Sequence, residues 1–114
     1  MNIEEVREFA LALEHVTEGT PFGADVLVFK VKEKMFLLLP LTTDTVQFNV
    51  KCDPEEAIQL REQYPDTILP GYHMSKKHWN TVIVNGDLKT KQLKEFIQAS
   101  YDLVNPIKKL KGKK

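Results

Sequence analysis

The densest group of polar, basic and aromatic side chains in the sequence lies between Pro70 and Val82. Lysine and histidine side chains bind phosphate oxygens, and an aromatic ring can stack on a nucleic-acid base. This mixture of residue types is typical of a surface that binds nucleic acid or a phosphorylated ligand. The residues that we predict to contact nucleic acid here are Lys76, Lys77, His78, Trp79 and Asn80. Tyr72 and His73 are the candidates for binding a smaller ligand.

Each of these residues also has a purely structural explanation. A tryptophan at the start of a strand often belongs to the hydrophobic core, and two adjacent lysines are common in a solvated turn. Both interpretations of Trp79 and of the Lys76-Lys77 pair stay open at this stage.

Basic residues outside this segment extend the predicted nucleic-acid surface. Lys51 ends a strand-like stretch in which Gln47 and Asn49 share its polar face. Five of the last seven residues are lysines, which suits phosphate binding or solubility alone. The lysines of this tail that we include as candidates are Lys108, Lys109 and Lys111.

The sequence offers no recognisable catalytic or metal-binding motif, so we predict a protein that is not an enzyme and uses no cofactor. His73 and His78 are five residues apart, which is a poor spacing for a shared metal ion. Cys52 lies between Lys51 and Asp53, where we expect a structural cysteine rather than a nucleophile.

Charge is distributed unevenly along the chain although the formal net charge is zero. The first 25 residues hold six acidic side chains and one basic side chain, whereas the last 27 hold eight basic and two acidic ones. This polarity is consistent with an acidic and a basic surface, and equally with ordinary solvated faces.

The hydrophobic pattern predicts an α+β fold, with an antiparallel β-sheet covered by helices on one face. The predicted helices run from Ile3 to Glu14, from Pro54 to Gln63 and from Thr90 to Val104. The predicted strands are Val26–Val31, Met35–Leu39, Val46–Lys51 and Trp79–Val84, and the stretch from Thr67 to Asn85 holds one or two strands in all, with a turn at Pro70-Gly71.

A chain of 114 residues fits one domain, which we place at residues 1–106, followed by a lysine-rich tail at 107–114. Its 42% of hydrophobic residues can form a core without disulfides or metal. The single cysteine, the absence of a signal-like start and the absence of a long apolar run predict a cytoplasmic protein without a membrane span. We expect a monomer.

Several stretches of the sequence resemble the YjbR/MmcQ family of small bacterial proteins, and the likeness extends from Asn2 to Val104. These stretches are Pro21-Phe22-Gly23, Lys34-Met35-Phe36, Val50-Lys51-Cys52-Asp53-Pro54, Pro70-Gly71-Tyr72-His73-Met74 and Lys76-Lys77-His78-Trp79-Asn80-Thr81-Val82. The resemblance implies a frataxin (CyaY)-like fold and a DNA-binding role. The chain departs from the expected pattern in the turn at Lys32-Glu33, where no glycine is present.

Two functions follow from these observations. In the first, the chain binds the phosphate backbone of double-stranded DNA with little sequence preference. In the second, it binds a protein or a small ligand, and its acidic first helix meets a basic partner or, by analogy with frataxin-like folds, a metal ion. The net charge of zero counts against the first function, and the uneven distribution of charge counts for it.

Overall fold

The computed structural model of the chain describes residues 1–71 and 74–105. The described residues form three helices, which are α1 (Ile3–Leu11), α2 (Pro54–Gln63) and α3 (Thr90–Val104). They also form six strands, which are β1 (Val16–Gly19), β2 (Val26–Val31), β3 (Lys34–Pro40), β4 (Gln47–Lys51), β5 (Ile68–Pro70) and β6 (Trp79–Ile83).

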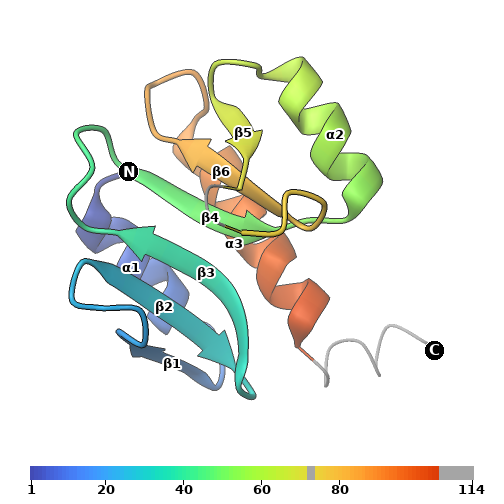
Figure 1. Cartoon of the computed structure of the whole chain (residues 1–114). Helices are drawn as coiled ribbons and strands as arrows, with labels where there is room; N and C mark the ends of the chain where they lie inside the picture. The colour runs from blue at the N-terminus through green and yellow to red at the C-terminus, as the bar shows by residue number, and fades with distance from the viewer. Residues whose placement is uncertain (72–73, 106–114) are drawn as a thin grey trace.

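The six strands make one antiparallel sheet in the order β1-β2-β3-β4-β6-β5. In Figure 1 the sheet faces the reader, α1 and α3 cross behind it, and α2 lies beside β5. This arrangement confirms the predicted α+β fold with helices on one face of an antiparallel sheet.

The main hydrophobic core lies between the sheet and the helices. All three helices contribute to it, through residues such as Val6 of α1, Leu60 of α2 and Ile97 of α3. The opposite face of the sheet carries a smaller cluster that contains Val28, Leu38 and Trp79. The sheet therefore buries apolar side chains on both faces, although helices cover only one of them.

A β-bulge in β3 shapes the core beneath α3. The pairing of β2 with β3 shifts after Phe29, so that Phe29 lies opposite Leu37 while Lys30 lies opposite Met35. The additional residue in β3 is Phe36, which is fully buried in the core. The hydroxyl of Ser100 in α3 donates a hydrogen bond to the Phe36 carbonyl at 2.5 Å, so the backbone carbonyl of the bulged residue has a side-chain partner.

The segment between α1 and β2 differs from the sequence prediction. The first helix ends at Leu11 rather than Glu14, and β1 was not predicted. His15 has a φ of 64° and reverses the chain, so Val16 pairs with Val31. A four-residue edge strand offers too short a pattern to detect, and it is recognisable only from its pairing with β2.

The turn between β2 and β3 is formed by two residues that rarely adopt its backbone conformation. Lys32 has a φ of 50° and Glu33 a φ of 69°. A two-residue hairpin turn of type I′ requires positive φ at both central positions, for which asparagine and glycine are preferred. The glycine-free turn noted in the sequence therefore forms, but with a strained backbone.

No helix within residues 1–71 and 74–105 is long and apolar enough to cross a lipid bilayer.

Candidate functional site

Trp79 and Asn80 are buried, which corrects their predicted role at a nucleic-acid surface. Trp79 is only 5% exposed and Asn80 only 1%. The Trp79 ring packs with Val28 and Leu38 on the helix-free face of the sheet, so the core interpretation of this tryptophan is correct. Asn80 points to the other face, where its amide Nδ2 donates to the carbonyl of Ala57 at 3.4 Å. Neither side chain is placed to meet a DNA backbone.

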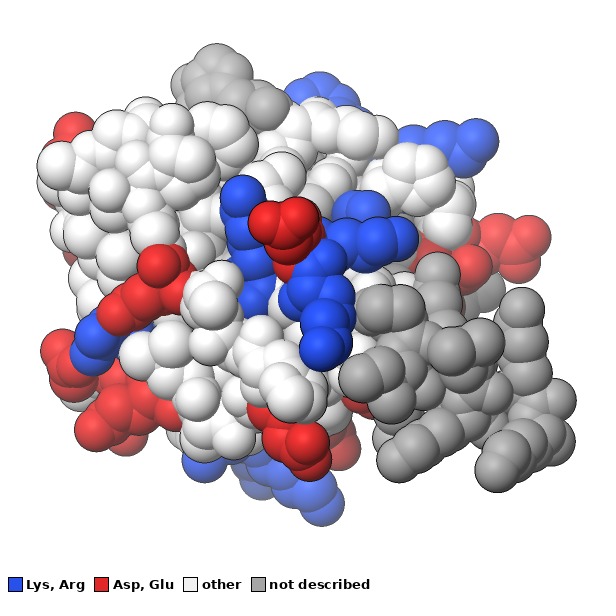
Figure 2. All heavy atoms as spheres, turned by 90° about the horizontal axis from the view of Figure 1, so that it is seen from below, with Lys and Arg blue, Asp and Glu red and all other residues white. Residues whose placement is uncertain are grey.

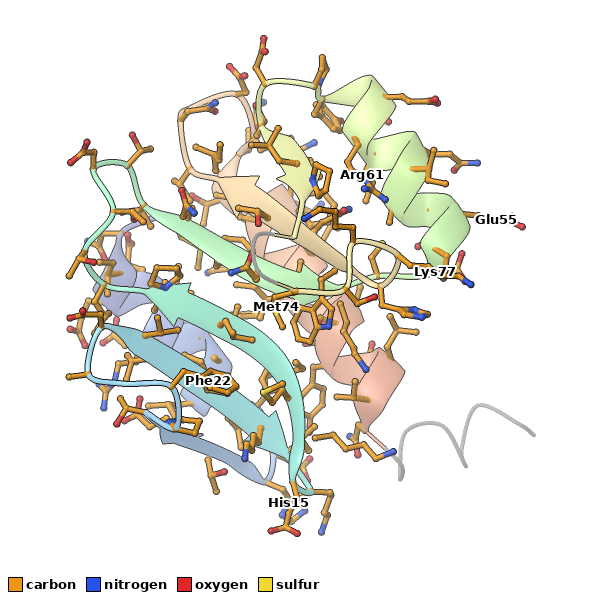
Figure 3. All side chains as sticks on the ribbon, viewed as in Figure 1. His15, Phe22, Glu55, Arg61, Met74 and Lys77 are labelled. Atoms are coloured by element: carbon orange, nitrogen blue, oxygen red, sulfur yellow. The ribbon has the colours of Figure 1, made fainter. Side chains whose placement is uncertain are left out.

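The segment before β6 is held close to the sheet by Gly71. The Gly71 N–H donates to the Trp79 carbonyl at 2.9 Å. A Cβ atom at this position would come within 2.7 Å of the Trp79 Cβ, so only glycine fits. Met74 then packs against the Trp79 cluster in front of the sheet (Figure 3). Tyr72 and His73, the two predicted ligand-binding residues, lie outside the described residues.

The structure brings three basic residues from separate elements to one hollow. Lys34 comes from the start of β3, Lys51 from the end of β4 and His78 from the turn before β6. They line a hollow of about 210 Å³ that also borders Asp53 and Val104. The Lys51 ammonium lies 5.9 Å from the centre of the Trp79 ring, so the buried tryptophan helps to position this lysine.

The basic character extends around this end of the molecule. Lys76 and Lys77 are exposed in the turn that precedes β6, and Figure 3 places Lys77 near the start of α2. In Figure 2, which views the molecule from below, Lys and Arg side chains gather near the middle of the face that includes the β2–β3 turn, with an acidic side chain among them. Lys108, Lys109 and Lys111 lie outside the described residues.

The polar face of β4 is less accessible than the sequence pattern predicts. Asn49 is buried and its Oδ1 accepts a hydrogen bond from the Thr81 hydroxyl of β6. Gln47 is half-buried. The alternation of polar residues in β4 therefore reflects a cross-strand hydrogen bond as much as a solvent-facing surface.

Cys52 has the environment of a structural cysteine. Its thiol is half-buried, and burial raises its pKa to about 11, with the carboxylates of Glu56 and Asp53 adding to the effect. The reactive form of cysteine is the thiolate, and a raised pKa keeps the thiol protonated at neutral pH.

The acidic residues of the first helix are largely engaged in local contacts. Arg7 donates to both carboxylate oxygens of Glu18, at 2.8 and 2.5 Å, and approaches Glu4 at 3.4 Å. Glu5 accepts a hydrogen bond from the backbone N–H of Asn2 in the capping box of α1. Arg7 is the single basic side chain of α1, against Glu4, Glu5 and Glu8, so the helix keeps a net negative charge. In the described part of the chain, no group of three or more His, Cys, Asp or Glu residues could hold a metal ion.

Sequence reasoning missed Lys34 as a member of the basic hollow. Its place in a Lys-rich hairpin is visible in the sequence, but the hairpin is more than fifteen residues away from Lys51. Only the pairing of β3 with β4 brings the two strands together.

Comparison with known proteins identifies the family. The YjbR family model matches residues 11–103, and the chain belongs to this family. The uncharacterized protein YbdF from Escherichia coli O157:H7 is 36% identical over 101 residues, which cover 89% of this chain and 82% of YbdF. The uncharacterized protein YjbR from Escherichia coli K12 is 28% identical, with 89% of this chain and 85% of YjbR covered.

Solved structures agree with this assignment. The crystal structure of Deinococcus radiodurans protein DR2400, with a domain of family DUF419, superposes with a TM-score of 0.86 at 38% identity and covers 90% of this chain and 78% of that one. A crystal structure of a Pseudomonas syringae protein superposes with a TM-score of 0.76 at 26% identity and covers 92% of this chain and all of the other. The family and the fold are thereby established.

Proposed function

We propose that this chain is a non-catalytic domain that binds the phosphate backbone of double-stranded DNA with little sequence preference. The observation that supports the proposal is the convergence of Lys34, Lys51 and His78 on one hollow. Three elements that are distant in the sequence supply these side chains, and each offers hydrogen-bond donors to phosphate oxygens.

The surroundings of the hollow favour an extended anion such as DNA. Lys76 and Lys77 are exposed immediately before His78, so they add positive charge beside it. Among residues 1–71 and 74–105, Asp53 supplies the one carboxylate that lines the hollow, and it accepts hydrogen bonds from the backbone N–H groups of Glu55 and Glu56. Its charge is therefore partly offset by the start of α2.

The burial of Trp79 and Asn80 explains the expected lack of sequence preference. Sequence is read by side chains that reach base edges, whereas contacts with phosphate mainly set affinity and position. Trp79 and Asn80, which could have read bases, are buried. The binding should therefore depend strongly on salt and weakly on sequence.

The test is the affinity for a labelled random duplex, measured by fluorescence anisotropy across a salt series. Each phosphate that the domain neutralises contributes about −0.9 to the slope of log affinity against log salt, so contacts from Lys34, Lys51, Lys76 and Lys77 give a slope of about −3.6. Replacing Lys34 and Lys77 together by glutamate should abolish binding. The matched control replaces Lys91 and Lys94, on the first turns of α3, by glutamate and should weaken binding far less.

A chain that ends at Pro106 separates the domain from its tail. If the slope persists without the tail, the folded domain carries the site. If the slope disappears with the tail, or if no binding is detected at about 50 mM salt, the proposal is wrong.

A further inference from the structure

A groove of about 670 Å³ opens between α2 and α3, on the helix-covered face of the sheet. Its floor comes from β4, β5 and β6, and its walls come from the two helices. Most of its lining is apolar, including Val50, Ile68, Val82, Leu60, Phe96 and Leu103. The volume lies within the range of about 300 to 1,000 Å³ that is typical of small-molecule sites.

The floor of this groove contains a polar atom whose hydrogen-bonding capacity is not used. Asn80 lines the groove and is 1% exposed. Its Oδ1 has less than 1 Å² of exposed surface and no hydrogen-bond partner within the described chain. A buried acceptor without a partner destabilises the fold, and an apolar residue of similar size would avoid that cost. The Nδ2 bond to the Ala57 carbonyl accounts for the donor half of this amide, and a ligand with a donor would satisfy its acceptor half.

The rim of the groove is acidic. Its carboxylates are those of Asp53, Glu56, Glu95 and Asp102. No salt bridge within residues 1–71 and 74–105 neutralises Glu56 or Glu95. Lys51 also borders the groove, but its ammonium lies over the Trp79 ring on the other face of the sheet. The rim therefore favours a positively charged ligand.

We propose that this groove binds a small organic cation with three features: an apolar body, an N–H or O–H donor on that body, and an ammonium group. The body fills the apolar floor, the donor bonds to Asn80 Oδ1, and the ammonium lies among the carboxylates of Glu56 and Glu95. Because Oδ1 is shielded from solvent, this bond requires the Asn80 amide to turn toward the groove and to give up its Nδ2 bond to the Ala57 carbonyl. The groove adjoins the basic hollow, with which it shares Lys51 and Asp53, but its proposed ligand contacts Glu56, Glu95 and Asn80, which do not line the hollow.

Tryptamine has all three features and is a suitable probe. Titration of the ¹⁵N-labelled full chain should shift the amide signals of α2, α3 and the Asn80 side chain. Indole-3-propionate keeps the ring but carries a carboxylate, and it should bind at least tenfold more weakly. 1-Methyltryptamine keeps the ammonium but lacks the ring N–H, and it should also bind several-fold more weakly.

Variants assign these effects to particular residues. Replacing Glu56 and Glu95 by glutamine should reduce the preference for tryptamine over indole-3-propionate by about tenfold. The matched control is Glu62→Gln, an exposed position of α2 outside the groove, which should leave the preference unchanged. Asn80→Leu should remove the preference for tryptamine over 1-methyltryptamine. The comparison of the three ligands on the unaltered chain keeps the test decisive if Asn80→Leu does not fold.

Three results would overturn the proposal. The first is no shift at 10 mM tryptamine, and the second is equal affinity for tryptamine and indole-3-propionate. The third is a change in the groove signals when the chain is shortened to Pro106 without ligand, because the lysine-rich tail would then be the occupant.

Discussion

Replacing Ser100 by alanine should destabilise the protein more than its small size suggests. The Ser100 hydroxyl is fully buried and connects three elements. It donates to the carbonyl of Phe36, the bulged residue of β3, at 2.5 Å, and it accepts from the N–H of Lys51 in β4 at 2.8 Å. Alanine would leave both backbone groups without a partner.

The expected loss can be worked out from these two contacts. A buried donor or acceptor that loses its partner costs about 1 to 3 kcal/mol. Lys51 is only half-buried and water can partly replace its bond, so we expect a total of about 2 to 4 kcal/mol. For a domain of this size, that loss lowers Tm by roughly 8 to 16 °C.

Urea unfolding and a thermal scan measure the effect, and the amide signal of Lys51 should move in the NMR spectrum. The control is Thr43→Ala, which removes an exposed hydroxyl that donates to the Thr45 carbonyl at 2.8 Å. This change should cost less than about 1 kcal/mol. A loss below about 1 kcal/mol for Ser100→Ala would refute the claim that this hydroxyl holds β3 and β4 to α3.

Three further predictions concern the β2–β3 turn and Cys52. Glu33→Gly should stabilise the protein by about 0.5 to 1 kcal/mol in urea unfolding, because glycine relieves the strain of the positive φ of 69° at a smaller entropic cost. The control Lys34→Gly, in β3, should destabilise the protein. A loss of stability on Glu33→Gly would contradict the account of the turn. The pKa of Cys52 is raised from 9.0 to about 11, so the rate of its alkylation by iodoacetamide should rise with a midpoint near pH 11. A midpoint near pH 9 would show that burial does not raise the pKa of this thiol. Because the folded state keeps the proton while the unfolded state loses it above pH 9, the stability of the native chain relative to Cys52→Ala should fall between pH 9 and pH 11.

The basic site was only partly predictable from the sequence. Lys76, Lys77 and His78 stand together in the chain and lie at the surface as expected. Trp79 and Asn80 belong to the same run of residues but are buried, because a strand turns alternate side chains to opposite faces and both faces of this sheet are covered at β6. The sequence pattern shows where β6 begins, but not what covers each face.

The groove was not predicted because its parts are far apart in the chain. Glu56 and Glu95 lie on different helices, and Asn80 lies on the strand below them. Each has an ordinary sequence context, so no local pattern marks it. Only the tertiary structure shows that Asn80 Oδ1 has no hydrogen-bond partner within the described chain.

Some elements of the fold follow from local interactions that the residue pattern makes visible. The bounds of α2, α3 and β2 follow from capping residues, apolar periodicity and β-branched content, all of which act over a few residues. The short edge strand β1, the bulge at Phe36 and the bridge through Ser100 depend on partners that are many residues away. Tertiary structure alone decided those features and both candidate sites, because burial and pairing are set by the packing of the whole sheet against its helices.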